Sequence, residues 1–267
     1  MHLLFDIGGT NLRVGISADG KELTQWQKVP TPSGFEDGIK ELENLTNKLC
    51  NQAQITKISG GIAGILDSSH ESLLWAPNLP GWIGQPFKSE LTRLFNCEIK
   101  LQNDAALAGL GEVHYGAGHG YTIVAYLTVS TGVGGARIVN GKIDHYSFGF
   151  EPGQQLIDMS GLTLEKQISG VAISRRFQKP VTEIIDPAIW QELGEKLASG
   201  LVNIITLWSP DIIIIGGGMM NDKNGIILKN VAVHLQKIFP ISGIPIPALV
   251  PAQLKDTNGL WGALAYA

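Results

Sequence analysis

Residues 3–13 read Leu-Leu-Phe-Asp-Ile-Gly-Gly-Thr-Asn-Leu-Arg, and this stretch decides the fold. An apolar strand delivers one carboxylate into a Gly-Gly-Thr turn, and a second apolar strand leaves the turn. Gly8 and Gly9 can adopt positive φ and bring backbone N–H groups close to an anion. The Thr10 hydroxyl and the Asn11 amide add hydrogen-bond donors. The turn is therefore a candidate phosphate site, and the alternative is a hairpin whose glycines serve only the turn.

Length, charge and cysteine usage exclude several classes of protein. A chain of 267 residues with a net charge of −4 can form one large or two modest domains. Its basic residues are scattered, with the densest pair at 175–176, so we expect no nucleic-acid partner. Because Met1 leads directly into a core strand, we expect neither a targeting peptide nor a preceding DNA-binding domain, and 212–215 is too short to span a membrane. Cys50 and Cys97 have no metal-ligand spacing, which favours a reducing, cytoplasmic location.

Apolar runs and turn signals alternate along the chain as they do in α/β proteins. Strands are expected at 2–7, 12–17, 23–28, 57–62, 98–102, 121–129, 136–139 and 211–215, and the main helices at 39–49, 104–114, 187–208 and 259–265. The second half begins like the first, because the strand at 121–129 enters a Ser-Thr-Gly-Val-Gly-Gly turn at 130–135. Two such hairpins suggest two related units facing one nucleotide, and chance similarity of glycine turns is the alternative.

The glycine-rich segments do not fit the other common nucleotide motifs. No G-x-x-x-x-G-K-[ST] occurs, which excludes a P-loop. At 130–137, Arg137 stands where the third glycine of a dinucleotide fingerprint belongs, and a strand pattern follows, so a Rossmann dehydrogenase is not expected. A third run, Gly216 to Gly218, ends the strand at 211–215, where a flat ligand ring could lie against bare backbone; a plain strand-to-helix turn is the alternative.

The order of seven motifs resembles that of the ROK family of sugar kinases, over essentially the whole chain. These motifs lie at 6–10, 78–82, 103–106, 130–135, 151–154, 161–165 and 216–218. The resemblance implies an α/β protein with the actin-like ATPase, or ribonuclease-H-like, fold, in which two lobes enclose sugar and nucleotide in a central cleft. We expect a smaller lobe over 1–115, with the C-terminal helix (259–267) packed on it, and a larger lobe over 116–258.

The resemblance also implies ATP-dependent phosphorylation of a hexose hydroxyl, glucose first, with Mg²⁺. Asp104 is the expected general base, and its alternative is a plain helix N-cap. Asp6 is expected to orient hydrated Mg²⁺, and its alternative is a strand-end carboxylate bonded to the turn amides. The expected nucleotide contacts are Asp6, Gly8, Gly9, Thr10, Asn11, Thr131, Gly132, Gly134, Gly217 and Gly218. The expected sugar contacts are Gly64, Asn78, Asn103, Asp104, Glu151, Gln154 and Glu165.

The polar sugar-side residues also have structural alternatives. Asn78 could cap its loop, Glu151 could lie in an exposed turn and Glu165 could lie on a solvated helix face. A non-catalytic sugar-binding protein and a sugar-sensing regulator are the alternative functions, and another hexose or an N-acetylhexosamine is the alternative acceptor. A homodimer is common among relatives, and we expect neither nucleic acid nor a membrane as partner.

The chain departs from the family pattern at the zinc site. Gln154 replaces the His of the family's E-x-G-H motif, and 156–164 contains no cysteine, so zinc is not expected. Family members without zinc include users of polyphosphate, which is the alternative to ATP as donor. Apolar side chains of this loop are expected to bury against the lobe instead; they are Leu156, Ile157, Met159, Leu162 and Leu164.

Overall fold

The computed structural model describes residues 1–51, 53–221 and 223–267. The chain divides into two compact units, and each is described by itself. Unit 1 comprises Met1–Gly116, His145–Gly149 and Asp256–Ala267, and unit 2 comprises Ala117–Asp144 and Phe150–Lys255. The lobe expected over 116–258 includes 145–149 and 256–258, which the structure assigns differently. Their contacts assign them to unit 1, because Tyr146 hydrogen-bonds Gln102 and Asp256 forms ion pairs with Arg13 and Lys28.

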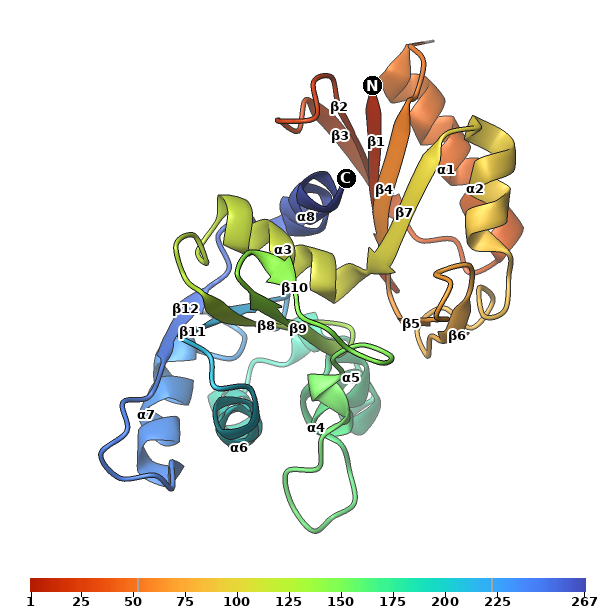
Figure 1. Cartoon of the computed structure of the whole chain (residues 1–267). Helices are drawn as coiled ribbons and strands as arrows, with labels where there is room; N and C mark the ends of the chain where they lie inside the picture. Colours follow the sequence, from red (N-terminus) through yellow and green to blue (C-terminus); the bar gives the residue numbers. More distant parts are fainter. Residues whose placement is uncertain (52, 222) are drawn as a thin grey trace. The chain divides into compact units, whose positions relative to one another are not determined.

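Unit 1 is built on a five-stranded mixed sheet with the order β3-β2-β1-β4-β7 (Figure 1). The strands are β1 (His2–Ile7), β2 (Asn11–Ser17), β3 (Gln25–Pro30), β4 (Lys57–Ile62) and β7 (Glu98–Asn103). The first three strands are antiparallel neighbours, whereas β1, β4 and β7 run parallel. A small pair, β5 (Ile65–Leu66) and β6 (Leu73–Trp75), follows β4.

Helices cover both faces of this sheet. They are α1 (Phe35–Cys50), α2 (Phe87–Phe95), α3 (Asp104–Tyr115) and α8 (Asn258–Tyr266). Successive side chains of a strand point to opposite faces, so Leu3, Phe5 and Ile7 of β1 pack in the core under α1 and α2. Asp6 faces the other way, toward Gly259 at the start of α8. Figure 1 shows α1 and α2 on one side of the sheet and α8 on the other.

Unit 2 repeats the same topology with a sheet of order β10-β9-β8-β11-β12. Its strands are β8 (Ile123–Val129), β9 (Val133–Val139), β10 (Lys142–Ile143), β11 (Ile212–Gly216) and β12 (Ala248–Pro251). Its helices are α4 (Leu164–Ile168), α5 (Gly170–Phe177), α6 (Pro187–Trp208) and α7 (Leu228–Ile238). Helix α6 supplies much of the core, and Asp186 caps its first turn by accepting the N–H of Ala188.

Among the residues that the structure describes, short 3₁₀ segments occur at η1 (Pro152–Gln154), η2 (Val181–Glu183) and η3 (Lys255–Thr257). None of the helices in the described ranges combines the length and the apolar composition that crossing a bilayer requires.

Candidate functional site

The first turn joins β1 to β2 through Gly8, Gly9 and Thr10. It is closed by the N–H of Gly8, which donates to the carbonyl of Asn11 at 3.0 Å. Neither Gly8 nor Gly9 uses the positive φ that glycine permits. Glycine is required at position 9 for space: a Cβ there would lie 2.5 Å from the Cβ of Asn78. The loop that carries Asn78 therefore packs directly on the turn.

Asp6 is a buried carboxylate that the structure pairs with a cation. Its Oδ2 lies 3.0 Å from an Nη of Arg13, the residue opposite it in the β1–β2 register. Arg13 also contacts Asp256, which in turn pairs with Lys28 at 2.7 Å. Burial raises the pKa of the Asp6 carboxyl, and the Arg13 guanidinium opposes that rise. The Asp6 carboxylate thus pairs with the side chain of Arg13. The alternative, in which it accepts hydrogen bonds from the turn amides, named a different partner.

The polar groups at this turn suit a Mg²⁺ ion that keeps most of its water ligands better than a metal ion held entirely by protein ligands. Mg²⁺ keeps several waters and is usually bound through one or two carboxylates together with substrate phosphates. Asp6 supplies one carboxylate beside a turn that has hydroxyl and amide donors. Within the described residues, no group of three or more His, Cys, Asp or Glu side chains is arranged to hold a metal.

The β7–α3 junction carries the proposed base. Asn103 is the N-cap of α3, since its Oδ1 accepts the N–H of Ala106 at 3.0 Å, so the alternative interpretation of Asp104 as the N-cap is wrong. Asp104 is the first residue of the helix, and its Oδ1 accepts the N–H of Ala105. A Cβ at Gly8 would lie 4.0 Å from Oδ2 of Asp104, which places this carboxylate beside the first turn.

A further contact ties the same junction to the end of β4. The side-chain amide of Asn103 donates to the carbonyl of Gly64 at 3.1 Å. Gly64 has a φ of +127°, a region that side-chain-bearing residues avoid. Within unit 1, the structure therefore brings Gly64, Asn103 and Asp104 together, and it places Asp104 near Gly8.

The second turn, in unit 2, joins β8 to β9 through Ser130, Thr131 and Gly132. The N–H of Ser130 donates to the carbonyl of Gly132 at 2.8 Å, which makes the turn tight. The first two N–H groups of α5, those of Gly170 and Val171, donate to the carbonyls of Ser130 and Thr131 at 2.7 and 3.3 Å. The start of α5 thus supports the turn.

The third glycine run lies at the same edge of this sheet. Strand β11 pairs with β8 so that Gly216 is opposite Thr128, and the N–H of Met219 donates to the carbonyl of Val129. Gly217 has a φ of +101°, and a Cβ there would lie 2.2 Å from the Val129 carbonyl oxygen. A Cβ at Gly218 would meet no atom within 4 Å. The exposed backbone of Gly218 is therefore open, next to the strand that leads into the second turn.

Three predicted sugar-side residues meet in unit 2. Glu165, in α4, accepts the N–H of Val133 at 2.8 Å and the side-chain amide of Gln154 at 3.1 Å. Burial and the nearby charge of Glu165 raise the pKa of Glu151 to about 7. Gln154 is therefore a hydrogen-bond donor to Glu165, and Glu165 is anchored to the first residue of β9 instead of lying on a freely solvated face.

Polar contacts hold the loop in which zinc-binding cysteines are missing. The expected apolar burial is wrong for three residues, because Leu156, Met159 and Leu162 are 58%, 102% and 46% exposed. Leu164 is buried and Ile157 packs partly against the core.

The buried Gln167 side chain supplies the main tie of this loop. It donates to Asp158 Oδ2 and to the Leu162 carbonyl, both at 3.1 Å. Asp158 Oδ1 also accepts the N–H of Ser160 at 2.8 Å. Hydrogen bonds of side-chain amide and carboxylate groups thus hold this loop in place, a role expected for apolar packing.

Two neighbours of the site were not singled out from the sequence. Arg13 could have been found, because a four-residue connection between Ile7 and Leu12 sets Asp6 opposite Arg13. Gln102, whose Oε1 accepts the N–H of Asn103 at 2.8 Å, has no sequence signal apart from its position at the end of a strand.

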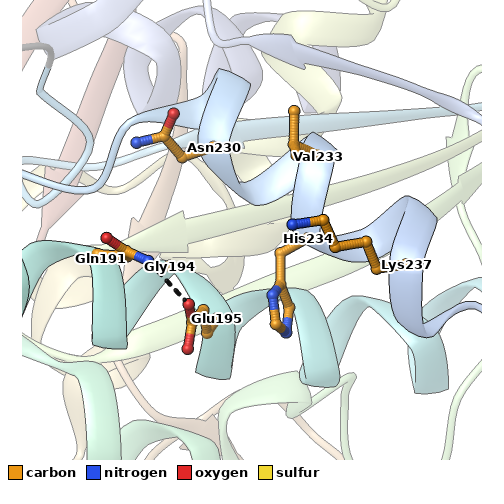
Figure 2. Close-up of a pocket in the computed structure, with 7 residues that line it drawn as sticks. All are labelled: Gln191, Gly194, Glu195, Asn230, Val233, His234 and Lys237. Carbon is orange, nitrogen blue, oxygen red and sulfur yellow. Dashed lines mark hydrogen bonds between the residues drawn. The ribbon is translucent and has the colours of Figure 1, made fainter.

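A groove of about 260 Å³ lies elsewhere in unit 2, between α6 and α7 (Figure 2). Its lining consists of Gln191, Gly194, Glu195, Asn230, Val233, His234 and Lys237. None of the residues predicted for sugar or nucleotide lines it, so its volume does not mark the candidate site.

The sequence matches the model of the ROK family over residues 3–267. It is 30% identical to the N-acetyl-D-glucosamine kinase of Escherichia fergusonii, over 98% of this chain and 98% of the relative. The crystal structure of the ROK hexokinase from Thermus thermophilus is 28% identical with a TM-score of 0.80, covering 98% of this chain and 96% of that one. The ROK family glucokinase from Streptomyces griseus, in complex with glucose and AMPPNP, has a TM-score of 0.86 at 24% identity, covering 100% and 98%. These likenesses confirm the expected actin-like ATPase fold.

Proposed function

The chain belongs to the ROK family, and on that premise we propose that it transfers a phosphoryl group from ATP to a hexose hydroxyl, with glucose as the first acceptor. The observation that carries the proposal is the placement of Asp104. It begins α3, it lies beside the turn of Gly8, and the adjacent Asn103 performs the capping. The helix therefore has its cap without the Asp104 carboxylate.

In this proposal, Asp104 takes the proton from the accepting hydroxyl as that oxygen attacks phosphorus. Most of the catalysis in phosphoryl transfer comes from positioning and from stabilising charge on the phosphate oxygens. General-base assistance contributes about 10²–10⁴ in rate. Asp104 is thus the residue whose loss should affect turnover most, while the fold keeps its cap.

The two turns are proposed to hold the phosphates from the two units. Thr10 and Asn11 supply donors in unit 1, and Thr131 and Gly132 supply them in unit 2. Mg²⁺, held through water by Asp6, would neutralise charge on the phosphate oxygens. Gly134 is proposed to let phosphate approach the strand backbone, and Gly217 and Gly218 to leave a flat surface for the adenine ring.

The sugar hydroxyls are proposed to bind amide and carboxyl groups of both units. Asn78 and Asn103 come from unit 1, and Glu151, Gln154 and Glu165 come from unit 2. A site that pairs hydroxyls in this way rejects a sugar lacking one of them, because the buried partner is then left unpaired. Gln154 supplies an amide where the family pattern has His, so we expect this residue to influence which sugar binds.

A second acceptor is N-acetylglucosamine. It is supported by the 30% identity to the N-acetyl-D-glucosamine kinase of Escherichia fergusonii. We also propose that the protein is cytoplasmic and that it forms a homodimer. Light scattering of the purified protein tests the dimer. Polyphosphate is the alternative donor, because the loop lacks the zinc-binding cysteines of the family pattern, as do some family members that use polyphosphate.

The test is a coupled assay of the purified protein with glucose, N-acetylglucosamine, mannose and fructose, each with ATP and with polyphosphate, in the presence of Mg²⁺. ADP release that depends on glucose supports the proposal. Sugar binding by calorimetry without turnover on any pair would overturn it in favour of a sugar-binding or sugar-sensing protein. Omission of the sugar is the control, since it measures hydrolysis of the donor by water.

A further inference from the structure

The segment His145–Gly149 lies with unit 1, although the chain on both sides of it belongs to unit 2. We call it the strap. It begins directly after Asp144, and Glu151 follows it after one residue. A segment that crosses into another unit needs a contact to hold it there, and the strap has one through a half-buried tyrosine, Tyr146.

The Tyr146 hydroxyl donates to Oε1 of Gln102 at 2.9 Å. The same oxygen accepts the backbone N–H of Asn103 at 2.8 Å. Gln102 is only 5% exposed, and its side chain also hydrogen-bonds Tyr266 near the end of α8. Both lone pairs of the amide oxygen are thus in use, and three segments of unit 1 meet on one buried amide.

The amide sits directly before the residues that carry the candidate chemistry. Asn103 caps α3 with its Oδ1 and reaches the Gly64 carbonyl with its Nδ2, and Asp104 follows it. If the Gln102 side chain rotates away, the partly buried N–H of Asn103 loses its acceptor, which native structures avoid. The orientation of the turn therefore depends on what keeps Gln102 in place.

We propose that Tyr146 is a positioning residue for phosphoryl transfer: its hydroxyl fixes the Gln102 amide, and through it the Asn103 N–H and the direction of Asp104. The proposal rests on the proposed function, in which Asp104 is the general base. The proposal gives the strap a role, because the strap precedes Glu151 in the sequence and hydrogen-bonds, through Tyr146, the residue just before Asn103 and Asp104. Proton transfer is sensitive to small displacements of the base, so a loosened turn lowers kcat.

The test is Tyr146→Phe, which keeps the ring and removes the hydroxyl. We expect kcat to fall roughly fivefold to tenfold, the change that loss of one hydrogen bond produces. The KM values for sugar and ATP should stay within about twofold, because no direct ligand contact is removed. Hydrogen exchange followed by NMR should show faster exchange at the Asn103 N–H, with the amides in the middle of β1 unchanged.

Tyr121→Phe is the matched control, since Tyr121 is 43% exposed and lies in unit 2; it should change neither kcat nor the exchange of Asn103. Unchanged exchange at Asn103 in Tyr146→Phe would overturn the proposal, whatever happens to kcat. Faster exchange with an unchanged kcat would also overturn it, by reducing Tyr146 to a structural contact. Exchange is measured without turnover, so a failure of the proposed function, seen as an active Asp104→Asn variant, is distinguished from a failure of this inference.

Discussion

The β1–β2 hairpin of unit 1 and the β8–β9 hairpin of unit 2 occupy the same place in their sheets, but they differ in charge. In the first, the residue pair one step before the turn is Asp6 and Arg13; in the second, it is Thr128 and Gly134. The backbone plan is shared, whereas the buried ion pair occurs in unit 1 alone at this position. The first hairpin thus has a buried carboxylate at this position, and the second has only a hydroxyl and a glycine.

The strands at the far edges of the two sheets continue this contrast. β7 leads into α3, which begins with Asp104, and α8, the helix that follows β12, begins with Asn258 and Gly259. Both helices belong to unit 1, but only α3 begins with a carboxylate. The proposed role of Asp104 in proton transfer can therefore be tested by single substitutions.

The largest effect is expected for Asp104→Asn. The variant keeps the shape of the side chain and the cap from Asn103, but it cannot accept a proton. We expect kcat to fall by about 10²–10⁴ while the melting temperature stays close to that of the wild type. Steady-state kinetics with thermal unfolding checks this. Asn258→Ala, at the matching position of α8, is the control and should leave turnover within a factor of about three. Near-normal kcat in Asp104→Asn would remove the proposed base.

Arg13→Met should cost the most stability. It leaves the buried Asp6 without its cation, and such a loss typically costs about 3–5 kcal/mol. Chemical unfolding of the variant measures this cost. The double variant Asp6→Asn with Arg13→Met should regain part of the loss, since it no longer buries an unpaired charge. Thr128→Ala, at the equivalent register position of unit 2, should change stability by about 1 kcal/mol or less; a loss equal to that of Arg13→Met would show that the ion pair is not the difference.

The hairpins and the longest helix could be predicted from the sequence because their signals are local. Alternating apolar residues on each side of a Gly-Thr turn indicate the strands, and the apolar spacing of 187–208 after Asp186 gives the bounds observed for α6. The helix at 228–238 was not predicted. It buries only Val231 and Leu235, so its apolar pattern is too sparse to stand out.

Three details of the structure depend on contacts that no local sequence pattern indicates. Gly9 is needed because the loop of Asn78 packs on it, not because of its φ. The loop after Gln154 is held by Gln167 and Asp158, whose polar pairing has no periodic signature. The strap belongs to unit 1 through Tyr146, a contact that no local pattern encodes. The candidate site residues follow from the family resemblance, whereas their hydrogen-bond partners follow only from the three-dimensional structure.

Glu151→Gln should remove the pH dependence of stability that results from burying the Glu151 carboxyl beside Glu165 in unit 2. Burial and Glu165 raise the pKa of Glu151 to about 7 in the fold, from an ordinary value of 4.5. The folded protein therefore holds a proton that the unfolded chain has lost, so stability falls as pH rises from about 4.5 to 7. The variant has no carboxyl at this position, so its stability does not fall in this way as the pH rises. At pH 8 it should be more stable than the wild type by roughly 1–2 kcal/mol, after allowance for partial exposure.

Unfolding of both proteins at pH 5 and pH 8 measures that difference, which should be much smaller at the lower pH. Glu165→Gln is the companion variant, because removal of the neighbouring charge should lower the pKa of Glu151 and flatten the pH dependence. Equal pH dependence in the wild type and in Glu151→Gln would mean that neither burial nor Glu165 raises the pKa of Glu151 in the fold.

Gly218→Ala should have the smallest effect on stability and a selective effect on the nucleotide. The added methyl group meets no protein atom within 4 Å, so we expect the free energy of unfolding to change by about 0.5 kcal/mol or less. If adenine lies on this backbone, the methyl group takes its space, and the KM for ATP should rise several-fold with kcat and the KM for sugar unchanged. Gly217→Ala is the contrasting neighbour: its φ of +101° and its 2.2 Å approach to the Val129 carbonyl should destabilise the fold. An unaltered KM for ATP in a stable Gly218→Ala variant would place the adenine ring elsewhere and leave the two turns as the whole nucleotide site.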